Sequence, residues 1–314
     1  MRIGYLDSAK GIAILLMVLG HALGMCDTLF SVNLIRYIYC FHMPLFFVIY
    51  GFLYEPLEKK VSYVIRKRAK SYLIPYFFWG GIYANVGIFE KIELLTYASH
   101  QSIDKSGSVT ALWFLPTFFI TTMIYAIVLK HLRMKKMSIV ATLIFLLIAV
   151  LLPKFSEGYP WGINIAFEGV AFMFVGSMMK SFIDKRSNKF LLASAACVSL
   201  ILMLSLLNGE VNMSVGMYGN HYVPFLFFAI IGSYSCIVYA KVMTSRLSVW
   251  TEKLGQCSLG ILCIHRPVLW MFREILNKVG LDISVLMSMV IATIAVAIAY
   301  CIAKMIQKIL PEVV

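Results

Sequence analysis

Two neighbouring stretches near the N-terminus decide the fold: residues 10–25, KGIAILLMVLGHALGM, and residues 39–53, YCFHMPLFFVIYGFL. Both are apolar enough to lie in membrane-spanning helices. Each nevertheless carries a histidine, His21 in the first and His42 in the second. An ionisable side chain is costly in hydrocarbon, so it normally faces the protein interior and is a functional-site hypothesis by default. The two stretches therefore predict a membrane protein with a reaction centre between its first helices.

The composition extends this prediction to the whole chain. Of the 314 residues, 61% are hydrophobic and 14% are charged, and the mean hydropathy is +0.85, whereas a soluble domain carries about 25% charged residues. No polar block is long enough for a separate soluble domain. We therefore expect one all-α, polytopic integral-membrane domain, residues 1–314. The apolar pattern predicts ten helices, at residues 9–29, 34–54, 72–89, 110–130, 138–154, 162–181, 190–208, 222–243, 257–274 and 284–305.

The basic residues orient these helices. Of the 28 Lys and Arg, 21 lie in or beside one set of alternate loops and 7 in the other. Basic residues collect in cytoplasmic loops, so both termini are expected in the cytoplasm. This bias also explains much of the net charge of +13 without a nucleic-acid partner. The seven cysteines form no CxxC pair, and the chain shows no zinc spacing, P-loop or dinucleotide fingerprint, so no metal is expected.

The polar residues inside the predicted spans are biased toward the outside. His21 lies 11 residues beyond Lys10, which is about 16 Å along a helix and within about 20° around it. His42 is expected at a similar depth, eight residues into the second span from its outer end. Six further residues are expected near the outer half of the membrane: Trp113, Glu168, Asn220, His221, His265 and Arg266. The pattern predicts a site open to the outside, above a cationic cytoplasmic floor.

Each of these residues has a functional and a plainer interpretation. A buried neutral histidine suits a general base, but it can also pack helices by bonding to a carbonyl. Glu168 can hold the base or grip sugar hydroxyls, or be a protonated packing carboxyl. Trp113 can stack on a sugar, or belong to an interfacial aromatic belt. The other four can contact substrate at the outer site, or be ordinary packing and loop residues: Asn220, His221, His265 and Arg266.

A basic segment follows the second span, in residues 64–79, VIRKRAKSYLIPYFFW. It is expected to be a loop that leads into a helix started or bent by Pro75. Arginine binds phosphate bidentately, so the segment predicts a phosphate clamp for a nucleotide-like donor. An ordinary positive-inside loop that touches anionic membrane lipid explains it equally well. The residues concerned are Arg66, Lys67, Arg68 and Lys70.

Several of these motifs together resemble a known family. Residues 2–24 resemble the opening helix of the membrane-bound acyltransferase 3 family, and FHMPLFFVIYGFL resembles its second-helix motif. RKRAKSYLIPYFFW, LWFLPTFFI and QCSLGILCIHRPVL resemble three further signatures, in order along nearly the whole chain. The short form looks most like the fucose 4-O-acetylase-like branch. Three positions depart from the usual family pattern. Lys10 occupies a position where the family often has arginine, Tyr50 one where it usually has serine, and Cys257 one where it usually has tyrosine.

The resemblance implies a bacterial inner-membrane O-acyltransferase. It implies transfer of an acetyl group from cytoplasmic acetyl-CoA to a hydroxyl of a surface or secreted glycan, or of its lipid-linked precursor. Carried onto this chain, His21 becomes the catalytic residue, either as a base or as a transient acyl carrier, and His42 could orient it or stabilise an oxyanion. Contacts to the acyl-CoA phosphates fall on Lys10, Arg66, Arg68 and Lys70.

Two other interpretations of the sequence stay open. A proton-coupled transporter or flippase for a sugar or lipid-linked intermediate could use His21 and His42 as a proton relay. Transporters often show internal repeats, and no repeat relates the two halves of this chain. A non-catalytic membrane partner in a glycan-assembly complex is the third possibility.

Overall fold

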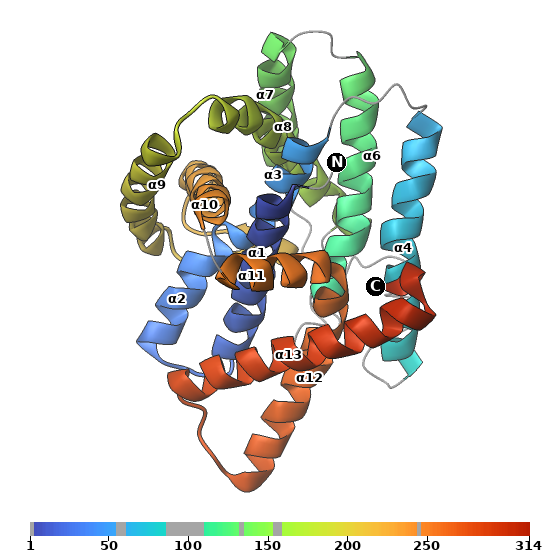
Figure 1. The fold of residues 1–314 in the computed structure, drawn as a ribbon, viewed down its shortest axis with the longest axis vertical. Helices are drawn as coiled ribbons and strands as arrows, with labels where there is room; N and C mark the ends of the chain where they lie inside the picture. The colour runs from blue at the N-terminus through green and yellow to red at the C-terminus, as the bar shows by residue number, and fades with distance from the viewer. Residues whose placement is uncertain (1–2, 55–60, 86–109, 132–134, 153–158, 244–245) are drawn as a thin grey trace.

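The computed structural model describes residues 3–54, 61–85, 110–131, 135–152, 159–243 and 246–314, and they form a helical bundle (Figure 1). Helix α1 lies at its centre and contacts α2, α3 and α10 to α13. The α-helices are α1 (Gly4–Leu23), α2 (Leu29–Tyr39), α3 (His42–Leu53), α4 (Val61–Asn85), α6 (Phe114–His131), α7 (Lys135–Leu151), α8 (Ile163–Asp184), α9 (Asn188–Leu202), α10 (Tyr222–Val242), α11 (Arg246–Gln256), α12 (Ser258–Val279) and α13 (Val285–Ile309). Short 3₁₀ turns and one small hairpin complete the described part: η2 (Thr110–Trp113), η3 (Pro160–Gly162), η4 (Met203–Asn208), β1 (Val211–Asn212), η5 (Met213–Val215), β2 (Met217–Tyr218) and η6 (Pro311–Val313).

The predicted all-α membrane fold is confirmed. Within the described residues, seven segments are long and apolar enough to cross a bilayer: Gly4–Leu23, Leu29–Leu53, Ala111–Leu129, Pro160–Asp184, Asn188–Asn208, Tyr222–Val242 and Val285–Ile309. The apolar part of α7 is shorter, at Ile139–Leu151. Helices α4 and α12 form where spans were predicted, but more polar residues keep them outside that set. The ends of two predicted spans, residues 86–89 and 153–154, lie outside the described residues.

The second predicted span is interrupted. The sequence predicts one helix over 34–54, whereas the structure has α2 and α3 with Cys40 and Phe41 between them. Pro44 explains the break, because it has no N–H for the carbonyl of Cys40 and its ring clashes with a helical carbonyl there. Regular bonding resumes from Leu45 N–H to Phe41 O, at 2.9 Å. His42 is therefore the first residue of a helix rather than a residue eight positions inside one.

Helix α11 was predicted to be a loop, and it is an amphipathic helix that lies across α1 (Figure 1). The two backbones touch at glycines. A Cβ on Gly11 would lie 1.9 Å from Thr251 O, and a Cβ on Gly255 would lie 1.8 Å from Asp7 O. Small residues allow helices in membranes to approach this closely. The contact fixes the N-terminal half of α1, which carries Lys10.

Helices α3 and α8 meet in the same way. A Cβ on Gly51 would lie 1.8 Å from Met173 O, and a Cβ on Gly176 would lie 2.0 Å from Val48 O. This packing holds the C-terminal part of α3, so the first residue of α3, His42, has a fixed direction toward α1.

Candidate active site

The histidines predicted from the sequence meet at a cavity of about 150 Å³. The predicted span, residues 9–29, put His21 near its middle. In the structure α1 begins at Gly4 and ends at Leu23, so His21 lies in its last turn. The α2–α3 break contributes Tyr39 and His42. Helix α12 contributes Arg266, and η2 contributes Trp113. The lining residues are Met17, His21, Tyr39, His42, Met43, Ala111, Trp113, Asn212, Met213, Ser214, Leu262 and Arg266.

His21 contacts three other polar side chains at this site. Its Nδ1 lies 3.0 Å from the hydroxyl oxygen of Tyr39 and 3.4 Å from Nη1 of Arg266. Its ring stacks on that of His265, with centroids 5.3 Å apart and planes at 24°. Gly20 makes room for the tyrosine, because a Cβ there would lie 2.5 Å from Tyr39 Cε1. The tyrosine and the imidazole are thus held together by the shape of α1.

His42 and His265 are fixed through one nitrogen each. Nδ1 of His42 donates to Ile38 O at 3.0 Å, and Nδ1 of His265 donates to Ile261 O at 3.0 Å and Leu262 O at 2.8 Å. In the neutral ring this leaves the lone pair on Nε2. These are the carbonyl bonds expected of helix-packing histidines, yet His42 also lines the cavity, and the ring of His265 stacks on that of His21. The ring of His42 lies 4.8 Å from that of Tyr39.

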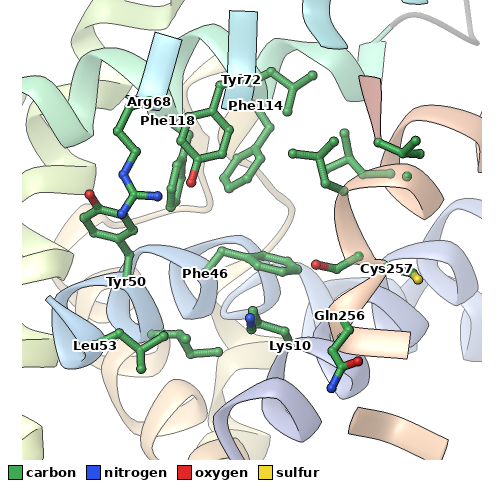
Figure 2. A pocket seen from close by; sticks show the side chains of 18 of the residues that line it. Lys10, Phe46, Tyr50, Leu53, Arg68, Tyr72, Phe114, Phe118, Gln256 and Cys257 are labelled. Carbon is green, nitrogen blue, oxygen red and sulfur yellow. The ribbon is translucent and has the colours of Figure 1, made fainter. Parts of the chain in front are cut away.

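A second, larger cavity of about 500 Å³ contains two of the four cations predicted to bind the donor, Lys10 and Arg68 (Figure 2). Lys10, Lys67 and Arg68 line it together with aromatic side chains. The guanidinium of Arg68 lies 4.8 Å from the centroid of the Tyr50 ring, and Lys10 forms an ion pair with Asp7. The aromatic residues are Phe46, Tyr50, Tyr54, Tyr63, Tyr72, Phe114 and Phe118.

Among the described residues, one residue lines both cavities. Leu262 of α12 lines the histidine cavity and the cationic cavity. It is the residue before Cys263 in the late signature, and its carbonyl also accepts from His265. The two chambers are therefore neighbours, divided at α12.

The basic segment was predicted to be a loop, but in the structure it forms the first turns of α4, and Pro75 lies inside that helix. A helix turns successive side chains in different directions. Arg68 consequently lines the cavity, whereas Arg66 and Lys70 are exposed and do not line it. Their contact with a donor stays a prediction.

Of the six residues predicted at the outer site, only Trp113 and Arg266 line the histidine cavity, and His265 reaches it only by stacking on His21. The other three lie elsewhere. Glu168 of α8 is fully buried and faces the hydroxyls of Tyr222 and Tyr218, although neither carboxyl oxygen makes a hydrogen bond of regular geometry. Asn220 is exposed and donates to Leu207 O at 3.3 Å, and His221 is exposed ahead of α10. A substrate role for these residues stays a prediction.

The sequence missed Tyr39, Asn212 and Ser214 among the cavity residues. Ser214 Oγ donates to Asn212 Oδ1 at 2.6 Å in the segment that closes the cavity. Tyr39 could have been found from Pro44, because a break there turns the end of one helix toward the start of the next. Nothing in the sequence marked the hairpin. Among the described residues, no group of three His, Cys, Asp or Glu is arranged to hold a metal ion.

The chain is similar to a known protein family and to two curated proteins. A family profile described as "Acyltransferase domain" matches residues 3–303. The chain is similar to Nodulation protein NolL of Sinorhizobium fredii, with 32% identity over 130 residues, which are 38% of this chain and 36% of that protein. It is also similar to Nodulation protein NolL of Mesorhizobium japonicum, with 38% identity over 80 residues, 23% of this chain and 21% of that protein.

The chain thus spans about a third or less of the length of these relatives. No solved structure matches. The family match, in contrast, covers nearly the whole chain. It contains every residue that lines the histidine cavity and every residue that lines the cationic cavity except Gln307 and Val314. The chain is therefore a multi-pass membrane protein of the acyltransferase 3 family.

Proposed function

We propose that this protein is an O-acetyltransferase of the bacterial cytoplasmic membrane, with both termini in the cytoplasm. It moves an acetyl group from acetyl-CoA to a sugar hydroxyl of a surface or secreted glycan, or of its lipid-linked precursor. The observation that carries the proposal is the shared border at Leu262 between a cavity with histidines and a cavity with cations. In the proposed reaction, the thioester end of a donor bound in the cationic cavity approaches the histidine cavity at Leu262.

The cationic cavity suits the donor. Coenzyme A is long and polyanionic. The lining of this cavity offers it one guanidinium group, from Arg68, and two ammonium groups, from Lys67 and Lys10. Arginine binds phosphate as a planar fork, and lysine binds it as a point charge. The aromatic remainder of the lining, with Phe46 and Phe118, suits the less polar arm of the cofactor. The thioester end would then approach Leu262.

The histidine cavity suits the chemistry. His21 acts as the general base that takes the proton of the attacking hydroxyl, or it carries the acetyl group transiently. Arg266, at 3.4 Å from His21 Nδ1, supplies positive charge where a tetrahedral oxyanion develops, and His42 lies on the same cavity wall. Trp113 offers a flat face for a sugar ring. The fucose 4-O-acetylase-like motifs favour acetyl as the acyl group.

The test uses the full-length protein in lipid nanodiscs. Glycan prepared from cells that lack the protein is the acceptor, and radiolabelled acetyl-CoA is the donor. We expect labelled glycan and a mass gain of one acetyl group per modified sugar. His21→Ala should lower the rate by about 10²- to 10⁴-fold, the usual contribution of a general base. Lys189→Ala, which changes an exposed side chain outside both cavities, is the control and should leave the rate unchanged.

One observation favours a second function. The break between α2 and α3 resembles the discontinuous helices of transporters. His21 and His42, which lie beside the break, could then relay protons. In that case deletion of the protein would stop export of a glycan intermediate, while no label from acetyl-CoA would enter the glycan. Label that enters the glycan and depends on His21 would reject the transporter.

A further inference from the structure

We propose that Tyr39 is a catalytic residue that relays the proton of the acceptor hydroxyl to His21. The hydroxyl of Tyr39 accepts that proton while it passes its own proton to Nδ1 of His21. This inference rests on the proposed acetyl transfer and adds a residue to it. In this scheme the base acts through the tyrosine, without direct contact between its basic nitrogen and the sugar.

The direction of the hydrogen bonds at His21 leads to this inference. A guanidinium can only donate, so Nη1 of Arg266, 3.4 Å away, meets a lone pair on His21 Nδ1. The neutral ring therefore carries its hydrogen on Nε2. The hydroxyl of Tyr39, 3.0 Å from the same Nδ1, must then be the donor. The basic nitrogen of His21 is occupied by the tyrosine, and a substrate hydroxyl reaches it most directly through that hydroxyl.

The surroundings hold Tyr39 in this position. It is the last residue of α2, directly before the break, and its ring fills the space that Gly20 leaves on α1. It also lines the histidine cavity itself. A tyrosine oxygen that donates one hydrogen bond keeps lone pairs with which it can accept another. Tyr39 can therefore bond to His21 and to an acceptor in the cavity at the same time.

The step is balanced. The acceptor oxygen attacks the thioester carbonyl carbon, and the C–O bond forms while the acceptor proton moves to the oxygen of Tyr39. The original proton of Tyr39 moves to Nδ1 of His21, which becomes an imidazolium. Collapse of the tetrahedral intermediate breaks the C–S bond. The departing thiolate receives the proton of the Tyr39 hydroxyl, and the tyrosine takes a proton back from Nδ1 of the imidazolium, so the ester and free CoA leave and both residues return to their starting forms.

The test separates this relay from a structural role. Tyr39→Phe in nanodiscs, with labelled acetyl-CoA and glycan from cells lacking the protein, should lower kcat by about 10²-fold or more, as for loss of a positioned proton-transfer group. Fluorinated tyrosines at position 39 keep the ring and hydroxyl but make the hydroxyl more acidic. They should move the alkaline limb of the kcat/KM profile to lower pH, because an ionised Tyr39 has no proton for His21. The same replacements at Tyr37, two residues away on α2 and outside the cavity, are the controls and should change neither quantity.

Each outcome decides. Full activity of Tyr39→Phe overturns the relay. An alkaline limb that fluorination leaves in place also overturns it, and then Tyr39 only positions His21. If the unaltered protein acetylates no glycan, the proposed function fails, and the relay fails with it. If the unaltered protein acetylates and only the Tyr39 predictions fail, the proposed function stands.

Discussion

Arg66 and Arg68 lie two residues apart on α4, and their side chains meet different surroundings. Arg68 lines the cationic cavity beside the Tyr50 ring, whereas Arg66 is exposed. The Tyr50 ring that Arg68 contacts is also a departure from the family pattern, which usually has serine at this position. A tyrosine in place of serine gives Arg68 an aromatic face, an arrangement that contributes about 0.5–2 kcal/mol. Tyr50 therefore narrows the cavity and also orients its arginine.

Arg68→Gln should raise the KM for acetyl-CoA about 10- to 100-fold, because a hydrogen bond to a charged group contributes about 1.5–3 kcal/mol. Arg66→Gln removes the same charge from the exposed face, so its effect should stay below about fivefold. Steady-state kinetics with varied acetyl-CoA measures both. Equal effects of the two variants would mean that the segment acts as a diffuse basic surface and that the cavity is not the donor site.

At the scale of the helices, two glycine contacts fix the geometry of the site. Gly176→Ala drives a methyl group into the carbonyl of Val48, 2.0 Å from the ideal Cβ, and should destabilise the protein by about 1–3 kcal/mol. Gly81→Ala on α4 meets nothing within 4 Å and should be neutral or stabilising by up to about 1 kcal/mol. Thermal unfolding of the full chain in detergent compares them. A stable Gly176→Ala protein would show that α3 and α8 do not pack this closely.

Gly20 allows a more selective test. Gly20→Ala places a methyl group 2.5 Å from Tyr39 Cε1, so the ring must move away from His21. A displacement of about 1 Å in a reacting group can lower a rate 10²-fold, and we expect kcat to fall by about that factor while KM for acetyl-CoA changes little. In Gly24→Ala the new methyl group makes only an ordinary contact, 3.4 Å from His21 O, and kcat should be retained. Comparable losses in the two variants would point to general disturbance of α1.

Particular residues show how far the sequence could predict these elements. His21 and His42 could be predicted to meet, because an ionisable side chain in an apolar helix has few places to go. The helix break between them was missed, although Pro44 stood in the quoted motif, because hydropathy averages over a single proline. Helix α11 was missed since its charged face lowers its hydropathy. Arg68 could not be separated from Arg66 without knowing that α4 begins before them.

At the scale of the whole molecule, Leu262 stands between the two chambers. If the acetyl group passes at Leu262, Leu262→Trp should block its path and lower acetyl transfer about 10²-fold, because the reacting groups no longer approach. Acetyl-CoA should still bind within about threefold of its normal Kd, since the cations of the larger cavity are untouched. Ile275→Trp on an exposed face of the same helix is the control. Transfer at the normal rate in Leu262→Trp would place the route elsewhere.

The position of Leu262 between the two cavities has a consequence for how the cell supplies acetyl groups. In the proposed reaction, only a two-carbon fragment has to pass that leucine. In that reaction neither the nucleotide carrier nor the polysaccharide would cross the bilayer, so the acetyl transfer itself would need no pump, gradient or exported cofactor. The energy of the thioester bond, made by central metabolism, is used directly on the far side. The degree to which the cell coat is decorated would then follow the internal supply of activated acetate.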